Sequence, residues 1–254
     1  PPGYLGTHYY LHLSLLWRQP AVNLGFVLKD PNGKQQSLPI NNTQGAWWPD
    51  NKSSYYSYRT DSPRGTARMD VILYNVNGSA PGALPQGGWS LQVANPSTST
   101  PAQLWGYLGD ALTSWNKGIA FDKHTSDKGL ICFPATADSA ITLGAYAGHV
   151  GSPYEPYPTG EQAGDLRGYS SRGIRIDGKH IMDVAAPDNP VTPINHNVGG
   201  PVGAADFQIF GGTSGAGPHV AAAALLVRQH DLTLTGAAVR AAIRQGAVAD
   251  SQVG

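Results

Sequence analysis

The first half of the chain alternates apolar and polar residues in short runs, and this pattern constrains its fold more than any other feature. The runs cover 11–17, 22–28 and 89–93, and in each the apolar side chains fall on every second residue. Side chains of a strand point alternately to its two faces, so each run predicts a half-buried antiparallel strand. Turn residues such as Asp30-Pro31-Asn32-Gly33 separate the runs. Short strands between dense turns predict a β-sandwich of the jelly-roll type over residues 1–125.

The second half changes character after a polar stretch at 122–128, where we expect a domain boundary. Residues 141–146 and 207–210 are short apolar runs of the buried-strand type, whereas 188–203 is rich in Gly, Pro and Asn and is expected to be a loop. Strands followed by helices are typical of an α/β domain, which we assign to residues 126–254.

Two helices are expected near the C-terminus. Small apolar residues recur at helical spacing from Pro218 to His230. Thr235 is a suitable N-cap for a second helix, whose buried face would carry Val239 and Ile243.

Composition excludes several classes of function. Lys plus Arg equal Asp plus Glu at 17 each, so no basic excess is available for a nucleic-acid backbone. No apolar run approaches the roughly 18 residues of a membrane span. A single cysteine excludes an intrachain disulfide framework.

The chemistry is concentrated in a glycine-rich turn that ends in Ser214 and opens the first helix. Small neighbours let a substrate backbone approach, and the helix N-terminus stabilises negative charge on a carbonyl oxygen. A serine hydroxyl becomes a good nucleophile only when a base takes its proton, so a histidine would have to lie within hydrogen-bond reach. Two alternatives stay open from these residues: Ser214 caps the helix, or it serves an unrelated serine hydrolase.

Three ordered blocks resemble the subtilisin-like serine proteases, or subtilases. Residues 212–226 (GTSGAGPHVAAAALL) resemble the family's serine motif G-T-S-x-A-x-P-H-V-A-G. Residues 134–145 resemble its P-A-x-A…V-I-T-V-G-A strand, and residues 170–188 its S-S-R-G-P…K-P-D-I-A-A-P-G segment. The resemblance covers about residues 129 to 250 and implies the C-terminal half of an α/β domain with a mostly parallel sheet and helices.

The resemblance also implies roles for individual residues. Ser214 matches the nucleophile, its backbone N–H would help to form the oxyanion hole, and Thr213 beside it would contact substrate. His219 matches a structural helix histidine, and Gly215 and Gly217 depart from the family pattern in a way expected to loosen the helix start. The segment that would line the specificity pocket consists of Cys132, Phe133, Pro134 and Ala135. Cys132 would then face the substrate side chain, or it is instead a small buried hydrophobic residue.

Other parts of the family pattern are missing from the sequence. It contains no D-[ST]-G strand end, no H-G-T-x-V-A helix start and no A-A-G-N, so the triad Asp and His and the oxyanion Asn are not found. We therefore expect the chain to be the serine-bearing part of a subtilase, partnered by the N-terminal half, and inactive alone. The alternative is a catalytically inactive subtilase scaffold with a binding or regulatory role. His8 follows Gly6-Thr7, whereas the family's histidine precedes Gly-Thr and opens a helix, so His8 does not match that motif. The other histidines are expected to be surface or core residues: His12, His124, His149, His180, His196 and His230.

The front domain resembles the P-domain-like jelly rolls that some subtilases carry as insertions. The resemblance rests on 28–33, which fits L-x-D-P-x-G, and on 88–93, which together with the preceding Gly87 fits G-x-W-x-L-x-V. A group of aromatic residues here would either bind sugar or an extended protein substrate or fill the sandwich core. This group consists of Trp47, Trp48, Tyr55, Tyr56 and Tyr58.

The family resemblance further implies protein or peptide substrates and an extracellular or cell-envelope location. The chemistry requires no cofactor. Structural calcium is common in the family, but no cluster of ligands in the sequence locates an ion, so no metal ligand is assigned.

Overall fold

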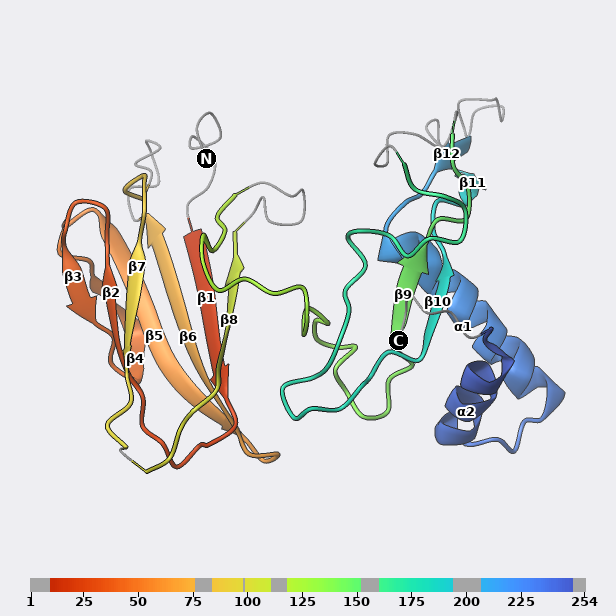
Figure 1. Ribbon diagram of the computed structural model, residues 1–254, viewed down its shortest axis with the longest axis horizontal. Helices are drawn as coiled ribbons and strands as arrows, with labels where there is room; N and C mark the ends of the chain where they lie inside the picture. The colour runs from red at the N-terminus through yellow and green to blue at the C-terminus, as the bar shows by residue number, and fades with distance from the viewer. Residues whose placement is uncertain are drawn as a thin grey trace. The chain divides into compact units, whose positions relative to one another are not determined.

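The computed structural model describes residues 10–75, 84–97, 99–110, 118–151, 160–193 and 207–248. Contacts divide the chain into two compact units, Pro1–Thr125 and Ser126–Gly254. The eight strands from β1 to β8 lie in the first unit, and the two helices of the described residues lie in the second (Figure 1).

The described residues of the first unit form two antiparallel sheets that share one core. Five strands form one sheet in the order β4-β5-β6-β1-β8, and three form the other in the order β3-β2-β7. The predicted strands at 11–17, 22–28 and 89–93 are confirmed as β1, β2 and β7, although β2 begins only at Gly25. The bounds are β1 Tyr10–Trp17, β2 Gly25–Lys29, β3 Gln35–Ser37, β4 Asn41–Trp47, β5 Ser53–Ser62, β6 Thr66–Asn75, β7 Ser90–Ala94 and β8 Leu104–Gly109.

Alternation along the strands builds the core between these sheets. On β1 the inward residues Leu13, Leu15 and Trp17 are buried, and Leu15 lies opposite the buried Met69 of β6. From the other sheet Phe26 packs its ring against Trp17, with 5.9 Å between ring centroids. Burial of each such side chain contributes roughly 1.5–3 kcal/mol to stability, and the period-2 pattern places these side chains in the core that the two sheets share.

The turn between β2 and β3 is built around Asp30, which is buried. Its Oδ1 accepts hydrogen bonds from the backbone N–H groups of Asn32 at 2.9 Å and Lys34 at 2.8 Å. Its Oδ2 accepts one from the Trp48 indole N–H at 3.0 Å. Gly33 takes the positive φ of 81° that the tight turn requires. The Asp-Pro-x-Gly sequence therefore closes the hairpin and also fixes a core tryptophan.

The aromatic group divides between the two faces of the five-stranded sheet. Trp48 and Tyr55 are buried in the core, as the core interpretation predicts. Trp47 is 57% exposed, and Tyr56 stacks on Tyr74 with 5.4 Å between ring centroids. A ligand-binding role for Trp47, Tyr56 and Tyr58 stays a prediction.

A buried carboxylate lies among polar side chains of β1 and β6. Asp70 accepts hydrogen bonds from His12 Nε2 at 2.8 Å and Ser14 Oγ at 2.5 Å, and Arg68 Nε pairs with its other oxygen at 2.7 Å. Burial by itself would raise the pKa of Asp70, but the hydrogen bonds from His12, Ser14 and Arg68 outweigh it and hold the pKa at about 2.

We expect Asp70→Asn to lower the free energy of unfolding of the first unit by about 1–3 kcal/mol at neutral pH, because it leaves these donors without their charged acceptor. The full difference in the free energy of unfolding between parent and variant should be present above pH 4. It should shrink as the pH falls from 4 towards 2, because Asp70 of the parent then becomes protonated as well. Urea unfolding followed by tryptophan fluorescence measures this. Asp61→Asn is the control, because the Asp61 side chain is half exposed and should change little. A difference between parent and Asp70→Asn that is independent of pH would contradict the assignment.

The described residues of the second unit form two pairs of strands and two helices. β9 (Leu143–Tyr146) and β10 (Val184–Pro187) are parallel, whereas β11 (Val191–Pro193) and β12 (Phe207–Ile209) are antiparallel. The helices are α1 (Thr213–His230) and α2 (Gly236–Gly246). The described residues show one parallel pair and not the larger parallel sheet that the resemblance implies.

The expectation that 188–203 is only a loop is wrong at Val191–Pro193, which is strand β11; residues 194–203 lie outside the described part. The reason is pairing with β12, which supplies backbone partners that a local Gly/Pro count does not show.

Small residues join α1 to β9 and β10. Ala216 and Val220 of α1 pack with Ala145 and Ala186 of the two strands. The second helix fits its prediction: Thr235 Oγ1 accepts a hydrogen bond from the Ala238 N–H at 3.2 Å, and Val239 is buried. Ile243, predicted to be buried, is half-buried.

Candidate active site

Ser214 occupies the first turn of α1, at the end of a short connection from β12. The N-cap is Gly212, with φ 86° and ψ 177°, and it makes no side-chain capping bond. Only glycine adopts this φ readily, so the turn requires it. Ser214 is therefore a helical residue with an exposed side chain, and the alternative that it caps the helix is wrong.

The backbone geometry leaves the start of α1 able to bind a developing negative charge. Gly215 N–H donates to the Gly212 carbonyl at 2.8 Å, and Ala216 N–H reaches the same oxygen at 3.3 Å. N–H groups before them have no carbonyl of the helix to bind. The Ser214 N–H belongs to this set and points with the helix dipole, which is the arrangement an oxyanion hole uses.

Because Gly215 departs from the family pattern, we expected it to loosen the helix start. The structure instead shows this glycine closely packed. A Cβ on this buried residue would lie 2.4 Å from the Phe210 carbonyl oxygen and 3.1 Å from Pro190 Cδ. The turn that presents Ser214 thus packs against Pro190, whose carbonyl also accepts the Phe210 N–H at 3.0 Å. Gly217, by contrast, has open space where a Cβ would be.

We expect Gly215→Ala to lower the free energy of unfolding of the second unit by about 1–3 kcal/mol, because the methyl group would collide with backbone. Gly217→Ala is the matched change on the same helix and should raise it by roughly 0.5–1 kcal/mol. Urea unfolding followed by helical circular dichroism measures both, since the described helices lie in this unit. Equal effects of the two substitutions would contradict the close packing at Gly215.

Residues 188–190, directly after β10, lie against the serine turn, where Pro190 packs on Gly215. Asp188 and Asn189 are buried, and Asn189 bonds to the backbone of His149 through both ends of its amide. Arg167, also buried, donates from Nε to Asp188 Oδ2 at 3.1 Å. Burial raises the pKa of Asp188, while the Arg167 guanidinium and the Gly212 N–H act in the opposite direction.

One feature of the sequence points to this support. Residues 179–188 resemble a family segment whose last residue is Gly, and this chain has Asp188 at that position. A charge in place of glycine indicates a partner, but Arg167 precedes it by 21 positions and only the fold brings the two together.

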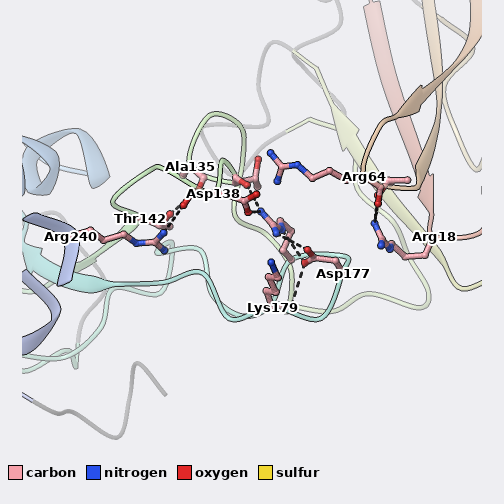
Figure 2. Close-up of polar contacts among 11 residues, drawn as sticks. Arg18, Arg64, Ala135, Asp138, Thr142, Asp177, Lys179 and Arg240 are labelled. Carbon is pink, nitrogen blue, oxygen red and sulfur yellow. Dashed lines mark hydrogen bonds and ion pairs between the residues drawn. The ribbon is translucent and has the colours of Figure 1, made fainter. Parts of the chain in front are cut away.

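The predicted substrate-binding segment lies near the start of β9, whereas Asp188 is bonded to Tyr146 at the end of this strand. Thr142, just before that strand, donates from Oγ1 to the Ala135 carbonyl at 2.6 Å (Figure 2). Cys132 is exposed, so its alternative reading as a buried hydrophobic residue is wrong, and Phe133 is 87% exposed. Among the described residues no hydrogen bond joins this segment, which also includes Pro134, to Thr213 or Ser214.

Within the part of the chain that the structure describes, no histidine is hydrogen-bonded to Ser214. His219 is exposed on α1, five residues further along. His12 binds Asp70 in the first unit, and His149 contacts Asn189. His8 and His196 lie outside the described residues.

The described ranges contain neither a metal-binding cluster nor a membrane-spanning helix. No group of three or more His, Cys, Asp or Glu side chains there could hold a metal ion. No helix in those ranges is long and apolar enough to span a membrane.

Comparison with known proteins bears on both units. A family model described as "Subtilase family" matches residues 116–254. Among solved structures, the chain is similar to the Clostridium perfringens CspB protease, with a TM-score of 0.60 and 16% sequence identity. That alignment covers 89% of this chain but 42% of the CspB chain, and at this identity it shows the fold alone. No curated protein matches the sequence.

Proposed function

The chain belongs to the subtilase family, and from this premise we propose that it is the serine-bearing part of a subtilisin-like serine endopeptidase. Ser214 Oγ attacks the carbonyl carbon of a peptide bond, a histidine takes the serine proton and returns it to the leaving amine, and water then releases the acyl group. The observation that carries the proposal is the placement of Ser214, exposed in the first turn of α1 within the segment that matches the family.

The N-terminal half of the protease is proposed as the partner that supplies the histidine, the aspartate and the oxyanion asparagine. The chain spans less than half of the CspB chain to which it is similar. α1 is apolar over most of its surface, yet Leu225 and Leu226 are 69% and 66% exposed. A helix that is apolar all round is normally buried, so this face suits contact with further segments of the catalytic domain. These further segments would complete the mostly parallel sheet around β9 and β10.

The first unit is proposed to be a jelly-roll domain inserted into the catalytic domain. Its first strand pairs with its last, and its second with its last but one, which suits a chain rolled up from both ends. We place the enzyme in the cell envelope or outside the cell, because subtilases commonly act there. Its substrates are proteins or peptides, and its chemistry uses no cofactor. Structural calcium is common in the family, but no calcium site is assigned here.

Reconstitution tests the proposal. The chain is mixed with, or produced beside, the polypeptide that carries the Asp, His and Asn motifs, and cleavage of a fluorogenic peptide is measured for each part and for the assembly. We expect hydrolysis by the assembly and little or none by the chain alone. An assembled protein that contains these motifs but cleaves no peptide library would favour an inactive scaffold with a regulatory role.

A further inference from the structure

The outer face of the five-stranded sheet is rich in aromatic side chains that the proposed catalytic chemistry does not use. The core lies on the inner face of this sheet, where Leu13 and Leu15 of β1 are buried. Alternate residues of each strand point the other way, and the strand pairing brings a group of aromatic residues to that outer face. The group consists of Tyr10, Trp47, Tyr56, Tyr58, Tyr74, Trp105 and Tyr107. An exposed surface of this composition is suited to contact with a ligand.

One row of these residues runs across four strands. Trp47 on β4 and Tyr10 on β1 lie at its two ends, with Tyr74 of β6 between them. Trp47 is 57% exposed and Tyr10 45%. Three strand spacings separate the two ends, so their backbones are about 14 Å apart. Between them the Tyr74 hydroxyl donates to that of Tyr56 at 3.2 Å. The row therefore has an accessible aromatic ring at each end and phenol hydroxyl groups in the middle.

Polar side chains that are held in fixed orientations lie on the same face. The Asp70 carboxylate is 2% exposed and accepts hydrogen bonds from His12, Ser14 and Arg68. The side chains of His12 and Arg68 are themselves 37% and 47% exposed. The buried carboxylate thus orients an imidazole and a guanidinium that stay accessible. Aromatic rings combined with a few oriented polar groups are what a site needs to bind a ligand and to fix its orientation.

The charge of the outer face decides between classes of ligand. Among the outward residues of the described strands, Arg68 and Asp70 bring the charges, and they pair with each other. A nucleic acid needs cations against its phosphates, which this balanced pair does not offer. A proline-rich peptide has carbonyl acceptors but no backbone N–H, so it cannot use the acceptor groups of this face. An uncharged sugar has hydroxyl groups that both donate and accept, and its C–H groups pack on the negative face of an aromatic ring.

We propose that the outer face of the five-stranded sheet binds an uncharged glycan chain of β-linked hexopyranoses. Sugar rings pack on Tyr10 and Trp47, and sugar hydroxyl groups bond to His12 and Arg68. Such a chain suits a sheet because its equatorial linkages keep it flat and leave axial C–H groups on its broad sides. The site lies in the first unit, so the inference goes beyond the proposed peptidase function and does not depend on the reactivity of Ser214.

Calorimetric titration of the whole chain tests the proposal. The probes are cellohexaose and the β-linked hexamer of N-acetylglucosamine, with heparin and a decaproline peptide for the two other classes of ligand. We expect saturable binding of at least one neutral hexamer, and none of heparin or decaproline at the same concentrations. Tyr10→Ala combined with Trp47→Ala should weaken the binding of the hexamer by at least about tenfold, because a few aromatic anchors carry most of the energy of such a contact.

Tyr169→Ala is the matched control. Tyr169 is 43% exposed and belongs to the second unit, so its loss should leave the affinity within about twofold of the parent. Urea unfolding followed by circular dichroism shows whether each variant keeps the stability of the parent, as expected for exposed side chains. Failure of both hexamers to bind, or equal affinity of the double variant and the parent, would overturn the proposal. Binding of heparin or decaproline that is lost in the double variant would assign the face to that other class of ligand instead.

Discussion

Replacement of Ser214 by alanine is expected to reduce peptide hydrolysis by the assembled protease by about 10⁶-fold in kcat, to the residual rate that substrate binding and the oxyanion hole provide. The size of the effect follows from chemistry: without Oγ no acyl-enzyme can form. The fold should not change, because the side chain is exposed and makes no hydrogen bond among the described residues.

Initial rates with a fluorogenic peptide, together with circular dichroism of the variant, test this. Ser139→Ala provides the matched control, since Ser139 is an exposed serine of the same unit and should keep full activity. Hydrolysis by Ser214→Ala within tenfold of the parent would remove Ser214 from the mechanism.

The largest expected effect on stability is that of Asp183→Asn, with a loss of about 3–5 kcal/mol in the free energy of unfolding of the second unit. The Asp183 side chain is 0% exposed. It accepts the Thr142 N–H at 2.8 Å beside β9 and the Arg240 Nε–H of α2 at 2.9 Å. One carboxylate thus joins α2 to the strand pair, and its neutralisation leaves Arg240 without a charged partner.

Helical circular dichroism during urea unfolding measures this loss. All six tryptophans lie at or before residue 115, so their fluorescence reports the first unit and should not change. Arg244→Ala is the control: Arg244 is 59% exposed and 3.6 Å from Asp183, so its loss should cost under about 1 kcal/mol. A loss below 1 kcal/mol for Asp183→Asn would show that α2 is held mainly by other contacts.

Local patterns predicted those parts of the fold that depend on near neighbours in sequence. The alternation at 11–17 needs only the two-residue period of a strand, and it recurs as the buried face of β1. Thr235 caps α2 through a bond to a residue three positions away. The serine turn could be identified because its function requires a fixed order of small residues.

Features that depend on distant parts of the chain could not be predicted in this way. β11 exists because β12 pairs with it across a long connection. Gly215 reads as a loss of helix propensity in the sequence, but the structure requires it because Pro190 and the Phe210 carbonyl occupy the space of a side chain. The Arg167–Asp188 pair follows from the folding of the chain around β10.

The claim that Ser214 is a nucleophile activated by a partner segment is tested most directly by covalent labelling. A fluorophosphonate probe is added to the assembled protease and to the chain alone, and the labelled peptide is identified by mass spectrometry. We expect rapid labelling at Ser214 in the assembly and labelling at least about 10³-fold slower in the chain alone, where no base activates Oγ. Rapid labelling of the isolated chain at Ser214, or an active assembly labelled at another residue, would contradict this account.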